Sequence, residues 1–143
     1  MRRIRATLAA LAVAGGLAAA GAAPAQAAPQ GRVDPGATLF STFHGTGCTY
    51  PMTVAVNSSG WVSFWEKSTR KNAKPIFLGR ALPDGGLAAV TWRPRHVGIR
   101  KIYATQNGRQ SRMGYVEVAE GFPLGPGSAC ITRFLPPPVP LPN

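Results

Sequence analysis

The stretch IRKIYATQNGRQSRMGYVEVA, residues 99–119, decides the fold class of this 143-residue chain. Apolar and polar side chains alternate on both sides of Asn107-Gly108, and a period of two is the pattern of a β-strand with one buried face. Asn-Gly between two such runs is the strongest short-range signal for a β-hairpin, because both residues tolerate the positive φ angles of a tight turn. The stretch therefore predicts a pair of antiparallel strands.

The rest of the chain extends this pattern. Its 17 Gly and 14 Pro residues make up over a fifth of the sequence, which is too much turn chemistry for a helical bundle. The length allows one ordinary domain. Seven strands are predicted, at approximately 38–43, 51–57, 61–66, 75–80, 87–92, 99–106 and 112–119. Seven short strands over about 80 residues, separated by Gly, Pro, Asn and Asp turns, predict an antiparallel β-sandwich.

The same alternation predicts the hydrophobic core. Every second side chain along five of these strands is apolar and is expected to face the opposite sheet. These residues are Met52, Val54, Val56, Val62, Phe64, Ala88, Val90, Trp92, Ile102, Ala104, Val116 and Val118.

The N-terminus predicts export. Arg2, Arg3 and Arg5 precede an Ala-rich apolar stretch that ends near Ala25-Gln26-Ala27, which is the pattern of a secretory signal peptide cleaved after Ala27. Glycines and a proline interrupt the stretch, which falls short of the roughly 20 apolar residues that cross a bilayer. We expect a secreted, extracellular protein without a membrane span.

Export changes the meaning of the charge and of the cysteines. Removing residues 1–27 takes away three arginines and no acids, so the formal charge of +11 becomes +8. Cys48 and Cys130 are the only cysteines, and in an oxidising compartment they indicate one disulfide more than a metal site or a catalytic thiol. Closing a loop of about 80 residues would stabilise the fold by roughly 4 kcal/mol.

These features divide the chain into four parts. Residues 1–27 are the signal peptide, 28–37 a leader, 38–120 the β-sandwich, and 121–143 a Pro/Gly-rich C-terminal extension. The end of the extension, residues 134–143, is so rich in proline that we expect an extended polyproline tail, which is either an exposed spacer or a recognition motif.

Four segments, taken in order, resemble the bacterial immunoglobulin-like repeats known as Ig-like domain 3. They are Gly60-Trp61-Val62-Ser63-Phe64-Trp65, Leu78-Gly79, the stretch DGGLAAVTWRP at residues 84–94, and Val97-Gly98 leading to Ile102-Tyr103-Ala104. The resemblance implies an immunoglobulin-like sandwich with an extracellular binding or spacer role, and it supplies no catalytic residues. Arg93, Arg95, Arg100 and Lys101 stand where the family usually carries neutral side chains, and the chain holds one copy instead of a tandem array.

The implied topology also places the two cysteines. The start of the second strand and the end of the last strand lie at the same pole of such a sandwich. Cys48 and Cys130 flank these points, so we expect their disulfide to tie the C-terminal extension to the base of the domain instead of crossing the core.

Aromatic side chains gather on the opposite face of one predicted sheet. The expected ligand-binding residues there are Trp61, Trp65, Tyr103, Tyr115 and Lys101. Exposed rings stack on sugars or bases and attract cations or partner side chains, and monomeric proteins rarely carry such a surface without a use. The alternative is that the leader or the Pro-rich tail covers this face.

Basic residues gather in two loops. The expected polyanion-binding residues are Lys67, Arg70, Lys71, Lys74, Arg93 and Arg95. Clustered cations concentrate anionic polymers, with an affinity that falls steeply as salt rises. A solvated loop that merely promotes solubility is the alternative.

Catalysis is not indicated. The five acids are scattered without paired spacing, and no nucleophile-elbow, zinc-protease or phosphate-loop motif is present, so we expect no enzyme, no catalytic residues, no cofactor and no metal. The sequence predicts a non-catalytic binding or adhesion module that associates with an extracellular or cell-envelope component: a glycan, an anionic polymer or a protein. The alternatives are a small-ligand carrier, a proteinaceous inhibitor with an exposed loop at residues 66–75, and a basic polyanion-binding or antimicrobial protein. Nucleic acid is not expected as a partner, and the oligomeric state is left open.

Overall fold

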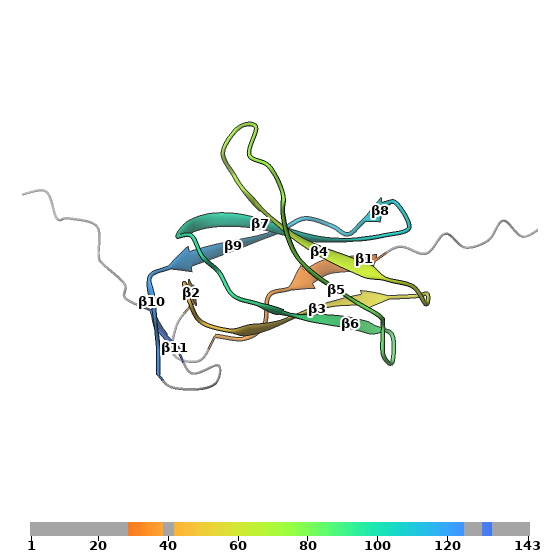
Figure 1. Ribbon diagram of the computed structural model, residues 1–143, viewed down its shortest axis with the longest axis horizontal. Coiled ribbons are helices and arrows are strands. Elements are labelled where there is room, and N and C mark those ends of the chain that lie inside the picture. Colours follow the sequence, from red (N-terminus) through yellow and green to blue (C-terminus); the bar gives the residue numbers. More distant parts are fainter. Residues whose placement is uncertain (1–28, 39–41, 125–129, 133–143) are drawn as a thin grey trace, which may run out of the picture.

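The computed structural model describes residues 29–38, 42–124 and 130–132, which form eleven strands and no helix. The predicted signal peptide and the polyproline tail lie outside the described residues. The all-β class is confirmed, and the two main sheets face each other in a sandwich-like arrangement (Figure 1).

The larger sheet has the order β2-β9-β7-β4-β5, and β8 pairs with the end of β7. Neighbouring strands are antiparallel, except that β2 runs parallel to β9. The strands are β2 (His44–Gly45), β4 (Val62–Ser68), β5 (Ile76–Ala81), β7 (Gly98–Gln106), β8 (Arg109–Gln110) and β9 (Gly114–Ala119).

The smaller sheet has the order β1-β3-β6, with all pairs antiparallel. Its strands are β1 (Pro29–Asp34), β3 (Tyr50–Val56) and β6 (Leu87–Trp92). A separate two-stranded ribbon, made of β10 (Gly121–Pro123) and β11 (Cys130–Thr132), lies at one end of the sandwich (Figure 1).

Six of the seven predicted strands are confirmed to within two residues at each end, as β3, β4, β5, β6, β7 and β9. The prediction for 38–43 is wrong: residues 42 and 43 form a bend, Thr38 is not in a strand, and residues 39–41 lie outside the described residues. The short parallel strand β2 begins only at His44.

The predicted leader is also wrong in its described part, because residues 29–34 form β1 and pair with β3. Pro29 stands at the first position of this edge strand, where a missing N–H is tolerated. Gly31 has a φ of 72°, and the register shifts between Gln30 and Asp34. This irregularity breaks the apolar alternation and leaves Val33 as the strand's large apolar core residue. A short irregular edge strand of this kind carries little periodic signal.

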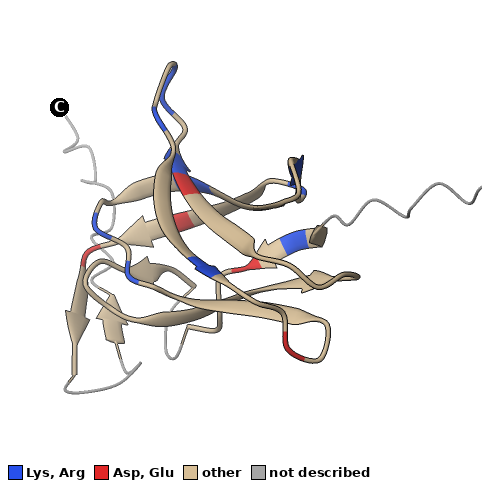
Figure 2. Cartoon of the chain, turned by 45° about the vertical axis from the view of Figure 1, so that its right-hand side comes forward, with Lys and Arg blue, Asp and Glu red and all other residues tan. Residues whose placement is uncertain are grey.

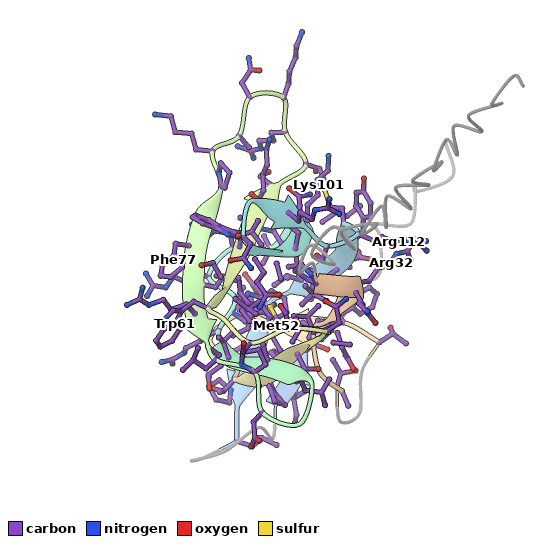
Figure 3. The ribbon with its side chains drawn as sticks, turned by 90° about the vertical axis from the view of Figure 1, so that its right-hand side faces the viewer. Arg32, Met52, Trp61, Phe77, Lys101 and Arg112 are labelled. Atoms are coloured by element: carbon purple, nitrogen blue, oxygen red, sulfur yellow. A yellow bond between two sulfur atoms is a disulfide. The ribbon has the colours of Figure 1, made fainter. Side chains whose placement is uncertain are left out.

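The predicted core is confirmed. Eleven of its twelve residues are buried, and Val90 is partly buried against them. Met52 lies in the middle of the body, between the two sheets (Figure 3). Alternation found this core because each strand has one face toward the opposite sheet.

The Asn107-Gly108 hairpin is confirmed as the turn between β7 and β8. Asn107 has a φ of 49° and Gly108 a φ of 75°, and the flanking pair is Gln106 with Arg109. Two positive φ angles in a two-residue loop match the right-handed twist of the strands they connect.

The disulfide between Cys48 and Cys130 is present, with the two Cα atoms 5.9 Å apart. Cys48 lies between β2 and β3, and Cys130 opens β11. The bond therefore joins the β10–β11 ribbon to the end of the sandwich, as expected, instead of crossing the core.

The ribbon meets β2 at two glycines that leave no room for a side chain. A Cβ atom on Gly121 would lie 2.6 Å from the Cα atom of Gly45 and 2.6 Å from the carbonyl oxygen of Thr46. Both obstacles are backbone atoms, which cannot rotate away. The close approach also lets the Gly121 N–H donate to the Thr46 hydroxyl oxygen at 3.2 Å.

We therefore predict that Gly121→Ala lowers the free energy of unfolding by about 1–3 kcal/mol, the usual cost of overpacking a tight contact. Urea unfolding of the oxidised protein measures the change. An unfolding free energy equal to that of the wild type would contradict the close contact between the ribbon and β2.

Candidate functional site

Two connections stand at one end of the sandwich. Residues 69–75 join β4 to β5 and project well beyond both sheets, and residues 93–97 join β6 to β7 (Figure 1). The projecting connection closes in a turn, because the Arg70 N–H donates to the Ser68 hydroxyl and the Ala73 N–H donates to the Arg70 carbonyl, both at 3.3 Å. Asn72 has a φ of 60° and is one of the residues that tolerate this left-handed conformation.

Two adjoining cavities lie here, and we call them together the basic cleft: the larger is lined by both connections, and the smaller by the 93–97 connection together with β4, β5 and β6. The larger, about 480 Å³, and the smaller, about 260 Å³, share Ile76 and His96. Their walls carry five cationic side chains and one carboxylate, Glu66. The cations are Arg70, Lys74 and Arg100 in the larger cavity, and Arg93 and Arg95 in the smaller. Figure 2 shows Lys and Arg along both connections.

A buried ion pair lies at the base of the cleft. Glu66 is 3% exposed and Arg100 is 7% exposed. The Arg100 Nε–H donates to Glu66 Oε1 at 2.5 Å, and the Trp92 Nε1–H donates to Glu66 Oε2 at 2.9 Å. Both carboxylate oxygens are thus occupied, and the charge of Glu66 is compensated by hydrogen bonds as well as by the guanidinium.

The structure brings together four of the six predicted polyanion-binding residues, namely Arg70, Lys74, Arg93 and Arg95. The other two, Lys67 and Lys71, do not line the cleft. Lys67 pairs in register with Lys101 on β7, and Lys71 is exposed on the projecting connection. Arg93 is anchored, because its Nε–H donates to the Gly47 carbonyl at 2.8 Å.

Glu66, Arg100 and His96 complete the cleft but were not predicted as site residues. A signal existed for the first two. Phe64 and Glu66 share one face of β4, and Arg100 and Ile102 share one face of β7, so alternation turns both charges toward the core. A carboxylate and a guanidinium on the core-facing side of the paired strands β4 and β7 indicate a buried ion pair.

The predicted ligand-binding aromatics belong to the outer face of the larger sheet, here called the aromatic face. Trp61 is 51% exposed and Tyr115 is 64% exposed. Each ring lies near a cation: the Arg80 guanidinium is 4.6 Å from the Trp61 ring centre, and Lys101 Nζ is 5.6 Å from that of Tyr115. Trp61 and Phe77 lie on the same side of the body (Figure 3).

Two of the aromatic residues are less available than expected. Tyr103 is only 8% exposed, and its direct partner across the strands is Trp65. Trp65 is half-buried, donates from Nε1 to the Thr105 hydroxyl at 2.9 Å and packs edge-on against Phe77. Large neighbouring side chains on one sheet face cover each other, and alternation does not reveal this. The leader and the Pro-rich tail were the two segments expected to cover the aromatic face if it is not free. The described part of the leader lies in the smaller sheet, and the tail lies outside the described residues.

His44 is buried, and its ring contacts Tyr50 on β3 and Trp92 on β6. Its Nε2–H donates to the Gly36 carbonyl at 3.0 Å, and Nδ1 has no partner among the described residues. Burial lowers the pKa of His44 below its ordinary value of 6.5, although the Gly36 carbonyl and nearby Asp34 oppose this shift. The ring is therefore neutral in the folded protein near pH 7.

Within residues 29–38, 42–124 and 130–132, no three His, Cys, Asp or Glu side chains gather as a metal site. Over the same ranges, no helix has the length and hydropathy that a bilayer crossing requires. A scan against protein-family models finds no match, and searches of the curated proteins and of the solved structures find none either. Any functional assignment therefore depends on the geometry of the cleft and of the aromatic face.

The lowered pKa of His44 makes stability depend on pH. Between the folded pKa and 6.5, the unfolded chain binds a proton at His44 that the folded chain does not bind. The contribution is therefore fully present above pH 6.5 and is lost as the pH falls, by up to about 1.4 kcal/mol per pH unit.

We predict that the free energy of unfolding of the wild type falls from pH 7.5 to pH 5, and that His44→Gln falls less over this range. Urea titrations at several pH values measure both slopes. Identical slopes for the two proteins would contradict the assignment to His44.

Proposed function

We propose that this chain is an exported, non-catalytic binding module of immunoglobulin type, and that it attaches to an anionic polymer of the cell envelope through the basic cleft. The observation that carries the proposal is the meeting of cations from two separate connections around one cleft. Clustered cations bind polyanions by releasing the counterions condensed on the polymer.

The immunoglobulin-type assignment is supported by topology. Two sheets with the orders β1-β3-β6 and β2-β9-β7-β4-β5 face each other, and the short strand β2 runs parallel to the last long strand, β9. The sequence segments that resemble Ig-like domain 3 lie on or beside β4, β5, β6 and β7. The β10–β11 ribbon is an addition to this plan.

Export is supported by two features. The N-terminal sequence has the pattern of a cleaved signal peptide, and both cysteines of the chain form a disulfide, which persists in oxidising compartments. Export would give the cationic cleft access to the anionic polymers outside the membrane.

The test of this function is the salt dependence of binding to polyanions. We expect the protein to bind poly(glycerol phosphate), dextran sulfate and poly-L-glutamate at about 0.15 M salt. The double variant Lys74→Gln/Arg95→Gln should weaken binding to all three and lower the slope of log affinity against log salt by about one unit per cation removed. Fluorescence titration at several salt concentrations measures both quantities.

The control is Arg32→Gln/Arg112→Gln, which removes the same charge from exposed positions that do not line the cleft. These two arginines lie on the other side of the body from Trp61 (Figure 3). The control should bind much as the wild type does. Equal losses in both double variants would mean that only net charge matters, and no binding by the wild type would overturn the function.

The aromatic face supports a second candidate, the binding of a neutral glycan or a protein. Trp61, Phe77 and Tyr115 are each at least half exposed on one sheet face, and such rings stack on sugars. Trp61→Ala should abolish binding to insoluble cell-wall glycan in a pull-down assay while changing stability by less than about 0.5 kcal/mol. Unchanged pull-down would remove this candidate without affecting the basic cleft.

A further inference from the structure

Arg100 has donors that the fold does not use. A guanidinium carries five N–H donors, and only the one on Nε is engaged, by Glu66. Neither Nη1 nor Nη2 has a partner among the described residues, although the residue is 7% exposed. Arg100 lines the larger cavity of the basic cleft, so these donors belong to its wall.

Glu66 fixes the direction of this guanidinium. Its Oε1 accepts from Arg100 Nε, and its Oε2 accepts from Trp92 Nε1 across the sandwich. The carboxylate thus orients Arg100 without occupying its terminal fork. A guanidinium held by its Nε in this way is preorganised for a ligand that accepts from Nη1 and Nη2 together.

The charge around this fork favours an anion. Arg70 and Lys74 also line the larger cavity, and its walls hold no Asp or Glu. Ile76, Val97 and Ile99 supply apolar wall between the cations. The smaller cavity continues past Ile76 and His96 to Arg93 and Arg95, so a second anionic group can lie there.

We propose that Arg100 binds a phosphate group of a phosphodiester-linked polymer through Nη1 and Nη2. This proposal names the ligand class of the function proposed above and depends on that function. A tetrahedral phosphate gives two oxygens to a guanidinium fork. The rest of the polymer, with its next phosphate, follows the cleft toward Arg93 and Arg95. A carboxylate has only two oxygens and cannot pair with the fork and with Arg70 or Lys74 at once, so a polycarboxylate binds the cleft through its overall charge instead of through the fork.

Arg100→Lys is the decisive variant, because it keeps the charge and removes the fork. We expect it to weaken binding to poly(glycerol phosphate) about tenfold, the loss that a charge-assisted hydrogen bond of ordinary strength represents, while binding to poly-L-glutamate changes by less than about twofold. Arg32→Lys is the matched control and should leave both affinities unchanged. Thermal unfolding of each variant reports whether the fold is retained.

Glu66→Gln provides an independent reading if Arg100→Lys does not fold. It keeps the guanidinium, but its amide has one acceptor oxygen and cannot accept from both Trp92 and Arg100, so the fork loses its fixed direction and affinity for poly(glycerol phosphate) should fall by about twofold or more. A purely structural ion pair would lose stability on this change without any loss of affinity in the folded protein, and that result overturns the proposal.

The remaining outcomes separate this proposal from the function it depends on. If all three polyanions bind but Arg100→Lys weakens them equally or not at all, the phosphate site is wrong and the polyanion function stands. Dextran sulfate following poly(glycerol phosphate) in its loss on Arg100→Lys would assign the fork to tetrahedral oxyanions generally and overturn selectivity for phosphate. Binding only to phosphatidylglycerol vesicles would identify a membrane surface and overturn the polymer. If the wild type binds no polyanion, both proposals fail.

Discussion

The carboxylate of Glu66 joins the two sheets of this sandwich at the end that carries the basic cleft. It stands on β4 and accepts hydrogen bonds from Arg100 on β7, in its own sheet, and from Trp92 on β6, in the opposite sheet. Burying two charges costs several kcal/mol each, and a well-packed apolar pair in their place is often as stable. The hydrogen bonds of Glu66 set the distance between the two sheets at this end and fix the orientation of the Arg100 guanidinium.

This polar end explains why the cleft stays open. Toward the middle of the body, Met52, Phe64 and Ile102 are fully buried between the sheets. Beyond Glu66 every Lys, Arg, Asp or Glu side chain of the cleft walls is a cation, and like charges keep the two connections from packing together. A set of cations without matching acids is costly to hold closely and is favourable only with an anion nearby.

Much of the fold followed from the sequence, since alternation and turn chemistry act locally. The hairpin at Asn107, the strands β3 to β7 with β9, and the core could all be derived from these two signals. The strands β1, β2, β10 and β11 could not. Each is short or irregular, and it forms because a partner strand or the disulfide holds it, which is tertiary information.

The candidate site divides in the same way. Charge clustering identified Arg70, Lys74, Arg93 and Arg95, because like residues gathered in two loops are visible in a sequence. That the two loops form one cleft required the structure. The burial of Tyr103 against its neighbour Trp65 also depends on side chains covering each other, which no strand pattern encodes.

The disulfide also affects the basic cleft, in addition to joining the β10–β11 ribbon to the sandwich. Gly47 precedes Cys48 directly, donates its N–H to the Pro94 carbonyl at 2.9 Å and accepts from the Arg93 side chain. One wall of the cleft is thus attached to the residue beside the sulfur bridge. In a chain whose thiols were still reduced, two hydrogen bonds alone would tie that wall to a segment no longer anchored by Cys130. Oxidation of the two cysteines therefore restrains the segment that holds this wall of the cleft as well as the ribbon.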